Sequence, residues 1–204
     1  VGSEMCIRDR AGVVAVKADS PYKTIEELVA AAKEKGNLKA STNGNKASNH
    51  TAAQLLAKSA GFKYKAIPYG GTADQLLALR QGEVDFTCAK VADVAKLVKG
   101  DKPELRVLAV FNTKRDPELP NVPTLGEKGL YPEWYGSARA LVAPKGTKPE
   151  VIQYYVEAFK KTMQDPAVIE AHKKAGMALD FKDNKELGDL IKAQDKFARD
   201  VVND

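Results

Sequence analysis

The residues with the clearest potential for binding chemistry form a polar segment, Ser41–His50, with the sequence STNGNKASNH. The segment has no large apolar residue, and its hydroxyl and carboxamide groups can donate and accept hydrogen bonds. Gly44 permits a positive φ angle and lets the backbone approach a bound group closely. The candidate ligand-binding residues here are Ser41, Thr42, Asn43, Gly44, Asn45, Ser48, Asn49 and His50.

A second segment, Tyr69–Thr72, offers similar chemistry through adjacent glycines. Gly70 and Gly71 leave space for backbone N–H groups to reach a ligand directly or through water. We therefore add Tyr69, Gly70, Gly71 and Thr72 to the candidate ligand-binding residues. Asp85, at the end of a later strand-like run, either fixes a neighbouring loop or recognises a ligand amine, and we favour the first role.

Each candidate also has an ordinary structural explanation. Loops of Ser, Asn and Gly before a helix are mostly N-caps and turns, so either segment alone is weak evidence for a ligand site. His50 fits a surface or packing role as well as a donor to a carboxylate, and Lys46 fits a solvated loop. Tyr69 fits the last core position of its strand. The second segment favours the anion-binding interpretation of the first.

Catalytic and metal chemistry have no support in the sequence, and we predict no catalytic residue, metal ligand or cofactor. No GxSxG, P-loop, GxGxxG or HExxH motif occurs, and His50 and His172 fall in different structural units. Cys88 has no local histidine or second cysteine to activate it, and no metal-ligand spacing occurs. The candidate residues are hydrogen-bonding groups around a polar ligand, which indicates a binding protein.

These segments need a scaffold that brings them together, and a repeated order of strand, loop and helix supplies it. The strand-like runs are 11–19, 38–42, 62–69, 83–89 and 105–111. The helical patterns between them are 20–37, 50–61, 72–82 and 90–100. This alternation predicts right-handed βαβ units, hence an α/β fold with a mostly parallel sheet and flanking helices. Loops at the carboxyl ends of such strands surround the ligand crevice, where the N–H groups of helix N-termini favour an anion.

Local signals place the helix boundaries and faces. Thr24 with Glu27 and Thr72 with Gln75 have the spacing of capping boxes, and Gly36 has the position of a C-terminal stop. The residues predicted to be buried are Ile25, Leu28, Val29 and Ala32 in the first helix and Ala52, Leu55, Leu56 and Ala60 in the second.

After residue 111 the pattern changes to a proline-rich connection, 112–133, for which we expect a surface path with a helical turn at Thr124–Lys128. The elements predicted beyond it are a strand at 137–144, a helix from Pro149 to before Pro166, a short helix at 166–176, a short strand at 177–181 and a terminal helix at 184–202. The change in composition indicates that the chain leaves one α/β lobe here and contributes its last helices to another.

Composition limits the function classes. The 204 residues are 44% hydrophobic and 29% charged, with a net charge of +5, which is enough to bury a core and mildly favours anionic partners. No apolar run approaches the roughly 20 residues of a membrane-spanning helix, and no aromatic-plus-basic motif indicates nucleic acid. Residues 1–10, VGSEMCIRDR, show neither the helical nor the strand periodicity of apolar residues, and they resemble an adapter-derived leader. We therefore exclude them, with Cys6, from the fold and expect a longer native N-terminus.

Several stretches stand in an order and spacing that resemble one known family: SPYKTIEEL, NGNKASNH, IPYGGTADQLLALRQGEVD, LAVFNTKRDPELPNVPTLGEKG and ALVAPKGTKPEVI. They are similar to the tripartite tricarboxylate transporter substrate-binding family, also called the Bug or TctC-type family, from about Ala11 to the C-terminus. The most specific stretch is TKRDPELPNVPTLGEKG, which looks like the family's signature connection.

The resemblance implies a monomeric periplasmic solute-binding protein whose two α/β lobes close on a small carboxylate and deliver it to a membrane permease. It implies that Ser41–His50 and Tyr69–Thr72 are ligand loops, the second with glycines that help position bridging waters. It also implies a periplasmic-binding-protein-like architecture with one complete lobe, 11–130, and the C-terminal part of the other, 131–204. The family's first carboxylate-contacting loop is absent from this sequence, and a signal peptide is expected in the missing N-terminal region.

The sequence departs from the family pattern inside the candidate loops. Lys46 and Asn49 stand where relatives usually carry Gly and Pro, Gly70 replaces a frequent lysine, and Ala89 replaces a frequent acidic residue. The ligand therefore stays open among a di- or tricarboxylate, an amino acid and an aromatic acid. Two alternatives to a transport role also stay open: an α/β enzyme acting on a small anionic substrate, and a ligand-sensing lobe of a signalling system.

Overall fold

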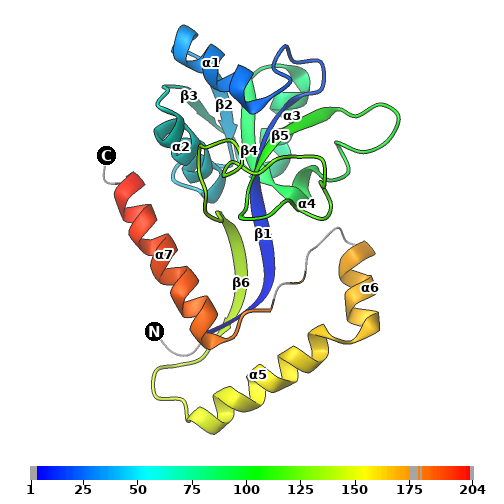
Figure 1. Ribbon diagram of the computed structural model, residues 1–204, viewed down its shortest axis with the longest axis vertical. Coiled ribbons are helices and arrows are strands. Elements are labelled where there is room, and N and C mark those ends of the chain that lie inside the picture. Colours follow the sequence, from blue (N-terminus) through cyan, green and yellow to red (C-terminus); the bar gives the residue numbers. More distant parts are fainter. Residues whose placement is uncertain (1–3, 175–178, 180, 203–204) are drawn as a thin grey trace. The chain divides into compact units, whose positions relative to one another are not determined.

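The computed structural model describes residues 4–174, 179 and 181–202 of the 204-residue chain. The chain divides into two compact units, labelled by their elements in Figure 1, and each is described by itself. The sheet unit is Ala11–Gly136. The helical unit comprises the described residues before Ala11 and after Gly136.

A mixed sheet forms the centre of the sheet unit, with the strand order β3-β2-β4-β1-β5. Its strands are β1 (Glu4–Lys17), β2 (Lys39–Thr42), β3 (Lys65–Pro68), β4 (Phe86–Lys90) and β5 (Leu105–Phe111). β2 pairs in parallel with β3 and with β4, as the βαβ pattern predicts. β1 is antiparallel to both β4 and β5, so the sheet is mixed and the expectation of a mostly parallel sheet is corrected. The α/β fold class is confirmed.

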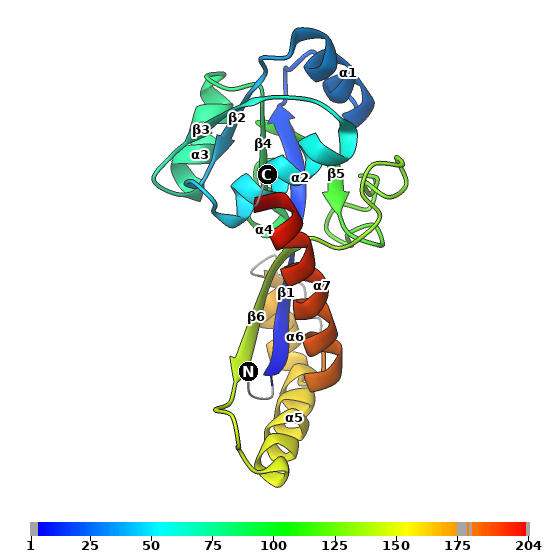
Figure 2. The ribbon, with the colours of Figure 1, turned by 90° about the vertical axis from the view of Figure 1, so that its left-hand side faces the viewer.

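β1 begins earlier than the sequence suggested. It starts at Glu4, inside the segment that we had excluded from the fold, and it pairs with β6 (Gly136–Val142) in addition to β4 and β5. Figures 1 and 2 show β1 and β6 side by side. Pairing with a distant strand extends β1 where its own sequence shows no alternation, which is why a local pattern could not locate its start.

The helices of the sheet unit follow the predicted boundaries closely. α1 (Ile25–Lys35) starts at Thr24, whose hydroxyl accepts the Glu27 N–H at 3.3 Å, and it ends at Gly36 with a φ of 64°. α2 (Ser48–Ala60) and α3 (Thr72–Gln81) follow β2 and β3. The predicted buried faces are confirmed for both α1 and α2. These apolar stripes pack the helices onto the sheet and fix where their first turns lie.

Two predicted segments differ from the structure. The helix expected at 90–100 shortens to α4 (Val91–Val94), because Lys90 still belongs to β4 and the chain then turns at Leu97 and Val98. The connection 112–133 is not wholly on the surface, since Leu125 is buried and its N–H donates to the Val110 carbonyl at 2.9 Å.

The sheet unit ends at Gly136, beyond the residue 130 that we expected. Tyr131 and Tyr135 pack on Phe111 with ring centroids 6.2 and 6.0 Å away. The Tyr135 carbonyl also accepts the Gly12 N–H at 2.8 Å. Aromatic packing and backbone pairing therefore keep this stretch on the sheet.

The helical unit contains β6 and three helices, α5 (Pro149–Met163), α6 (Pro166–Lys174) and α7 (Asn184–Val202). α5 begins at Pro149 and ends before Pro166, as proline chemistry predicts. The short strand expected at 177–181 falls largely outside the described residues. Among the helices described, none combines the length and apolar character needed to cross a membrane.

Candidate ligand-binding site

The two candidate loops leave neighbouring parallel strands at the same edge of the sheet. Thr42, the last residue of β2, is in register with Pro68, the last residue of β3. The Tyr69 N–H donates to the Thr42 carbonyl at 2.9 Å, which holds the starts of the two loops together. Because each loop leads into a helix, the first turns of α2 and α3 also emerge at this edge.

A buried hydrogen bond joins the first turns of the two helices. Asn49 of α2 donates through Nδ2 to Oε1 of Gln75 of α3 at 2.9 Å, and the two residues are 1% and 0% exposed. A side-chain bridge of this length requires the N-terminal turns of α2 and α3 to lie close together. The two helix starts are therefore neighbours at this edge of the sheet, as an anion site between the two loops requires.

Gln75 is the centre of a buried polar network and not a cap. Its Nε2 lies 2.5 Å from Thr87 Oγ1, 2.7 Å from the Cys88 carbonyl and 3.2 Å from the Ser41 carbonyl. The predicted Thr72–Gln75 capping box is wrong, because Gly71 is the N-cap and no side chain caps α3. The carbonyls at the ends of β2 and β4 need a donor, and Gln75 supplies it from inside the fold.

The side chains of Ser41 and Thr42 are interior groups. Both residues are fully buried. The Ser41 hydroxyl lies 3.0 Å from both the Gln75 carbonyl and Thr87 Oγ1, and the Thr42 hydroxyl reaches the Gly44 carbonyl at 3.5 Å. Asn49 is buried as well. These residues, which we expected to contact ligand, instead hold the loop and the helix start in place, and we omit them from the proposed contact set.

The middle of the first loop shapes the entrance to α2. Asn43 Oδ1 accepts the Asn49 N–H at 3.3 Å, so its carboxamide takes the capping role. Gly44 has a φ of 120°, and Lys46 has the left-handed value of 58°. Asn45 is exposed. The loop therefore turns sharply and presents its middle residues outward. Lys46 is exposed, which agrees with its ordinary structural explanation as a solvated loop residue.

His50 is half-buried beside this loop. Its Nδ1 accepts the Lys46 N–H at 3.0 Å, which places the proton of the neutral ring on Nε2. Burial lowers the pKa of His50 below its ordinary value of 6.5. Within the described part of the chain, the backbone N–H groups of Ser48 and His50 donate to no protein acceptor.

The second loop is open at its glycines. A Cβ atom added at Gly71 would have no neighbour within 4 Å, whereas one at Gly70 would lie 3.4 Å from Asp74 Oδ2. Among the described residues, no protein acceptor receives the N–H groups of Gly70, Gly71 and Thr72. Tyr69 donates its hydroxyl to Glu83 at 3.0 Å, and partial burial together with that carboxylate raises its pKa.

Asp85 lies at the other edge of the sheet and does not join the candidate site. Its carboxylate accepts the Lys39 N–H at 2.7 Å, and its own N–H donates to the Lys39 carbonyl at 2.9 Å. Lys39 is the first residue of β2, and an extended strand places it about 10 Å from Thr42 at the other end. Asp85 therefore anchors the amino end of β2, which agrees with the loop-fixing role that we favoured, and we omit it from the proposed contact set.

Sequence reasoning missed Lys90, which lies beneath the first turn of α2. This last residue of β4 is 3% exposed, and its Nζ donates to Asn49 Oδ1 at 2.9 Å. The ammonium also stands 5.8 Å from the centroid of the Tyr135 ring. The Tyr135 hydroxyl donates to the Ser48 carbonyl at 3.2 Å, and burial raises its pKa. A lysine directly after the predicted strand 83–89, at the edge that carries the candidate loops, was the available signal.

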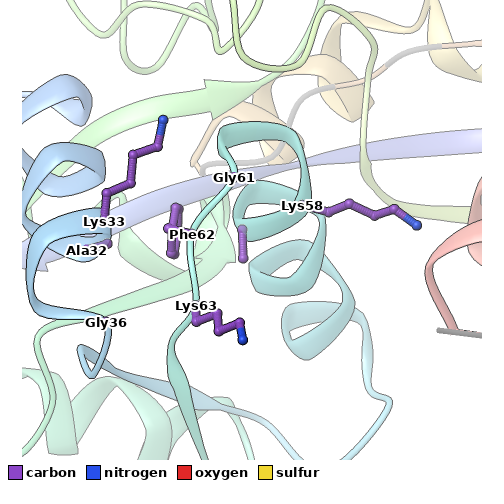
Figure 3. Close-up of a pocket in the computed structure, with 8 residues that line it drawn as sticks. Ala32, Lys33, Gly36, Lys58, Gly61, Phe62 and Lys63 are labelled. Atoms are coloured by element: carbon purple, nitrogen blue, oxygen red, sulfur yellow. The ribbon is translucent and has the colours of Figure 1, made fainter.

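A separate cavity of about 420 Å³ lies at the far end of α2 and is shown in Figure 3. It is bounded by the C-terminal glycines of α1 and α2, Gly36 and Gly61, with Phe62 and three lysines, Lys33, Lys58 and Lys63. Helix C-termini carry a partial negative charge, which lysines complement. Because it lies at the opposite end of α2 from Ser48, this cavity is not part of the candidate site.

The described residues contain no candidate nucleophilic or metal-binding centre. Cys88 is buried, and burial raises its pKa to about 12, so its thiol stays protonated. No group of three His, Cys, Asp or Glu side chains in the described part of the chain could hold a metal ion. What the described loops offer is a set of N–H groups around a small open surface.

Comparison with known proteins identifies relatives of the whole described chain. The family model described as "Tripartite tricarboxylate transporter family receptor" matches residues 5–204. A protein of Cupriavidus necator named "UPF0065 protein in gbd 5' region" is 38% identical over 152 residues, covering 74% of this chain and 45% of the relative. The chain spans about half the length of the curated relatives it matches.

Solved structures share the fold. A TctC solute-binding protein from Polaromonas has a TM-score of 0.89 and 27% identity, covering 98% of this chain and 68% of the other. Two Rhodopseudomonas palustris proteins share the fold at 20% identity: MatC with bound malate (TM-score 0.77; 97% of this chain, 68% of the other) and Rpa4515 with adipate (0.78; 99% and 68%).

These matches also confirm the expected periplasmic-binding-protein-like fold, and they favour a receptor over an enzyme. With the family model covering nearly its entire length, the chain belongs to the tripartite tricarboxylate transporter family of receptors.

Proposed function

We propose that this chain is part of a periplasmic solute-binding protein that captures a small carboxylate and delivers it to a membrane permease of the tripartite tricarboxylate type. The ligand is held without covalent chemistry by the N–H groups at the starts of α2 and α3. Membership of a receptor family supports the transport role, and the permease is the partner that this role requires. The periplasmic location follows from the same family.

The observation that carries this proposal is the hydrogen bond between Asn49 and Gln75, which brings two helix N-termini together at one sheet edge. A single helix N-terminus stabilises a nearby negative charge by roughly 0.3–1 kcal/mol when exposed and by up to about 2 kcal/mol when partly buried. Two neighbouring openings, with additional neutral hydrogen bonds, therefore hold a carboxylate more tightly than either opening alone. The proposed contact residues are Gly44, Asn45, Ser48, His50, Gly70, Gly71 and Thr72.

A titration of the isotope-labelled chain by NMR tests this proposal. Malate and adipate are suitable probes, because structures of the same fold contain them. We expect the amide resonances of Ser48, His50, Gly70 and Gly71 to shift with a common dissociation constant. Shifts confined to other parts of the chain, or no shifts at millimolar probe, would contradict the proposal.

Two obstructing variants and a matched control sharpen the test. Gly71→Leu places a side chain in open space on backbone that any residue adopts, so it blocks the site without straining the fold. Ser48→Leu places a bulky side chain at a half-buried position in the first turn of α2. Ser59→Leu, at an exposed position near the far end of α2, is the control. We expect the first two variants to lose binding with unchanged unfolding curves, and the control to bind as the wild type does.

A further inference from the structure

The first turn of α2 lies over a buried positive charge. Lys90 is 3% exposed, and its ammonium is 2.9 Å from Asn49 Oδ1 and 5.8 Å from the centre of the Tyr135 ring. Tyr135 in turn donates to the Ser48 carbonyl at 3.2 Å. Lys90 therefore reaches two successive residues of the first turn, Asn49 directly and Ser48 through Tyr135.

Burial of an ammonium is costly unless nearby groups stabilise the charged form. Both contacts do so, since the amide oxygen accepts a hydrogen bond and the aromatic face attracts a cation. The charge is fixed under the helix opening, where water screens it less than it screens a surface lysine. Its field adds to the positive end of the α2 dipole.

The start of α3 has the opposite charge environment. The first turn of α2 contains no acidic residue, whereas the first turn of α3 contains Asp74. Asp74 is exposed, and its carboxylate lies near Gly70. An incoming anion therefore meets a fixed negative charge at α3 and a fixed positive charge at α2.

We propose that Lys90 is the positioning residue that makes this site select anionic ligands, by placing a buried charge beneath Asn49 and the first turn of α2. This inference rests on the proposed carboxylate-binding function and adds to it which helix start receives the carboxylate. Lys90 acts through Asn49 and the field of its charge, and it does not touch the ligand. The ligand class that it selects is a carboxylate over an uncharged molecule of the same shape.

Charge selectivity, measured as the ratio of two dissociation constants, tests the role of Lys90. The probes are malate and its uncharged diamide, malamide, titrated into the chain while the Ser48 and His50 amides are followed by NMR. We expect the wild type to prefer malate by about ten-fold or more. In Lys90→Gln, which keeps a donor for Asn49 but removes the charge, we expect roughly ten-fold weaker malate binding and malamide binding within about two-fold of wild type.

Thr87→Val is the matched control, because it removes hydrogen bonds to Gln75 and Ser41 from the same buried network without changing the charge. A purely structural role of Lys90 would weaken the binding of both probes together, as we expect this control to do. Lys90→Met, which removes donor and charge, is expected to match Lys90→Gln in selectivity. Equal loss of both probes in Lys90→Gln, or an unchanged malate constant, would overturn the inference and leave the proposed function intact.

If the variants do not fold, binding of the two probes to the wild-type chain still tests the inference. Equal binding of malate and malamide by the wild-type chain would exclude a selective charge at this site. If neither malate nor malamide binds to the wild-type chain, both the proposed function and this inference are overturned. The two failures are therefore distinguished by whether the wild type binds at all.

Discussion

The starts of α2 and α3 have similar local structures, but the charged residues next to them have opposite signs. Each helix follows a strand of the same parallel pair, and each lacks a side-chain N-cap from its own N-cap residue. At α2 the first turn has no acid and a buried lysine beneath it. At α3 the first turn carries Asp74, and its Gln75 is turned into the core.

Two polar loops of similar sequence can therefore contribute unequally to anion binding. At α3, the dipole already has an acidic partner, and the side chain that looked like a cap holds the strands together. At α2, the dipole is reinforced by Lys90 and left without an internal acid. We infer that the carboxylate binds chiefly at the start of α2, with the N–H groups of the loop before α3 as its second contact.

The largest effect should come from Gln75, the residue on which both helix starts depend. Gln75→Leu leaves the Ser41 and Cys88 carbonyls and Asn49 Nδ2 without their buried partner, so we expect the free energy of unfolding to fall by roughly 2–4 kcal/mol. Denaturant unfolding followed by the fluorescence of Trp134, which packs against the sheet-unit core, measures this loss.

Gln81→Leu, at the exposed end of the same helix, serves as the control and should change stability little. If both variants unfold at the same denaturant concentration, the buried network does not support the fold as we describe it. That result would contradict the structural role that we assign to Gln75 at the start of α3.

A smaller effect is expected when an acid is added to α2. Ser48→Asp gives α2 the charge pattern of α3, so malate binding should weaken by about ten-fold while the helix itself gains roughly 0.3–1 kcal/mol. Titration by NMR and denaturant unfolding measure the two changes separately. Weaker binding without any loss of stability would separate an electrostatic cause from damage to the fold, and unchanged malate affinity would show that the anion does not bind at α2.

The fold was largely predictable because its determinants are local. Thr24, Glu27 and Gly36 mark the ends of α1 through contacts within one turn. In α2, the spacing of apolar residues such as Leu55 and Leu56 is enough to predict their burial. The rule that parallel strands place their loops at one edge also predicted that the two candidate loops lie together. The start of β1 escaped prediction because pairing with β6 decides it.

The site was only partly predictable, because burial of its polar groups depends on distant strands. Gln75 has the spacing of a cap, yet its acceptors at Ser41 and Cys88 come from β2 and β4. Lys90 looked like the start of a surface helix, and only the packing of Tyr135 and Asn49 around it reveals its burial. Asp85 was different, since its place before β4 already put it at the amino end of the parallel strands.

Removing the acid from α3 should have a modest effect of opposite sign. Asp74→Asn takes a negative charge from the second helix start, so we expect malate to bind roughly two- to five-fold more tightly. Malamide serves as the uncharged control probe and should bind unchanged. Tighter binding of both probes would indicate a steric cause, and an unchanged malate constant would place Asp74 outside the field of the site.

The smallest expected effect is a pH dependence that belongs to the α2 loop alone. Burial lowers the pKa of His50, and protonation of Nδ1 would remove its hydrogen bond from the Lys46 N–H. The unfolded chain therefore takes up this proton at a higher pH than the folded chain. The contribution of His50 to the free energy of unfolding is complete above about pH 6.5 and is lost as the pH falls toward the lowered folded pKa. Denaturant unfolding of the wild type and of His50→Gln at about pH 7.5 and about pH 5.5, roughly one unit on either side of the ordinary pKa, measures this contribution. A pH slope unchanged in the variant would assign the dependence to other groups.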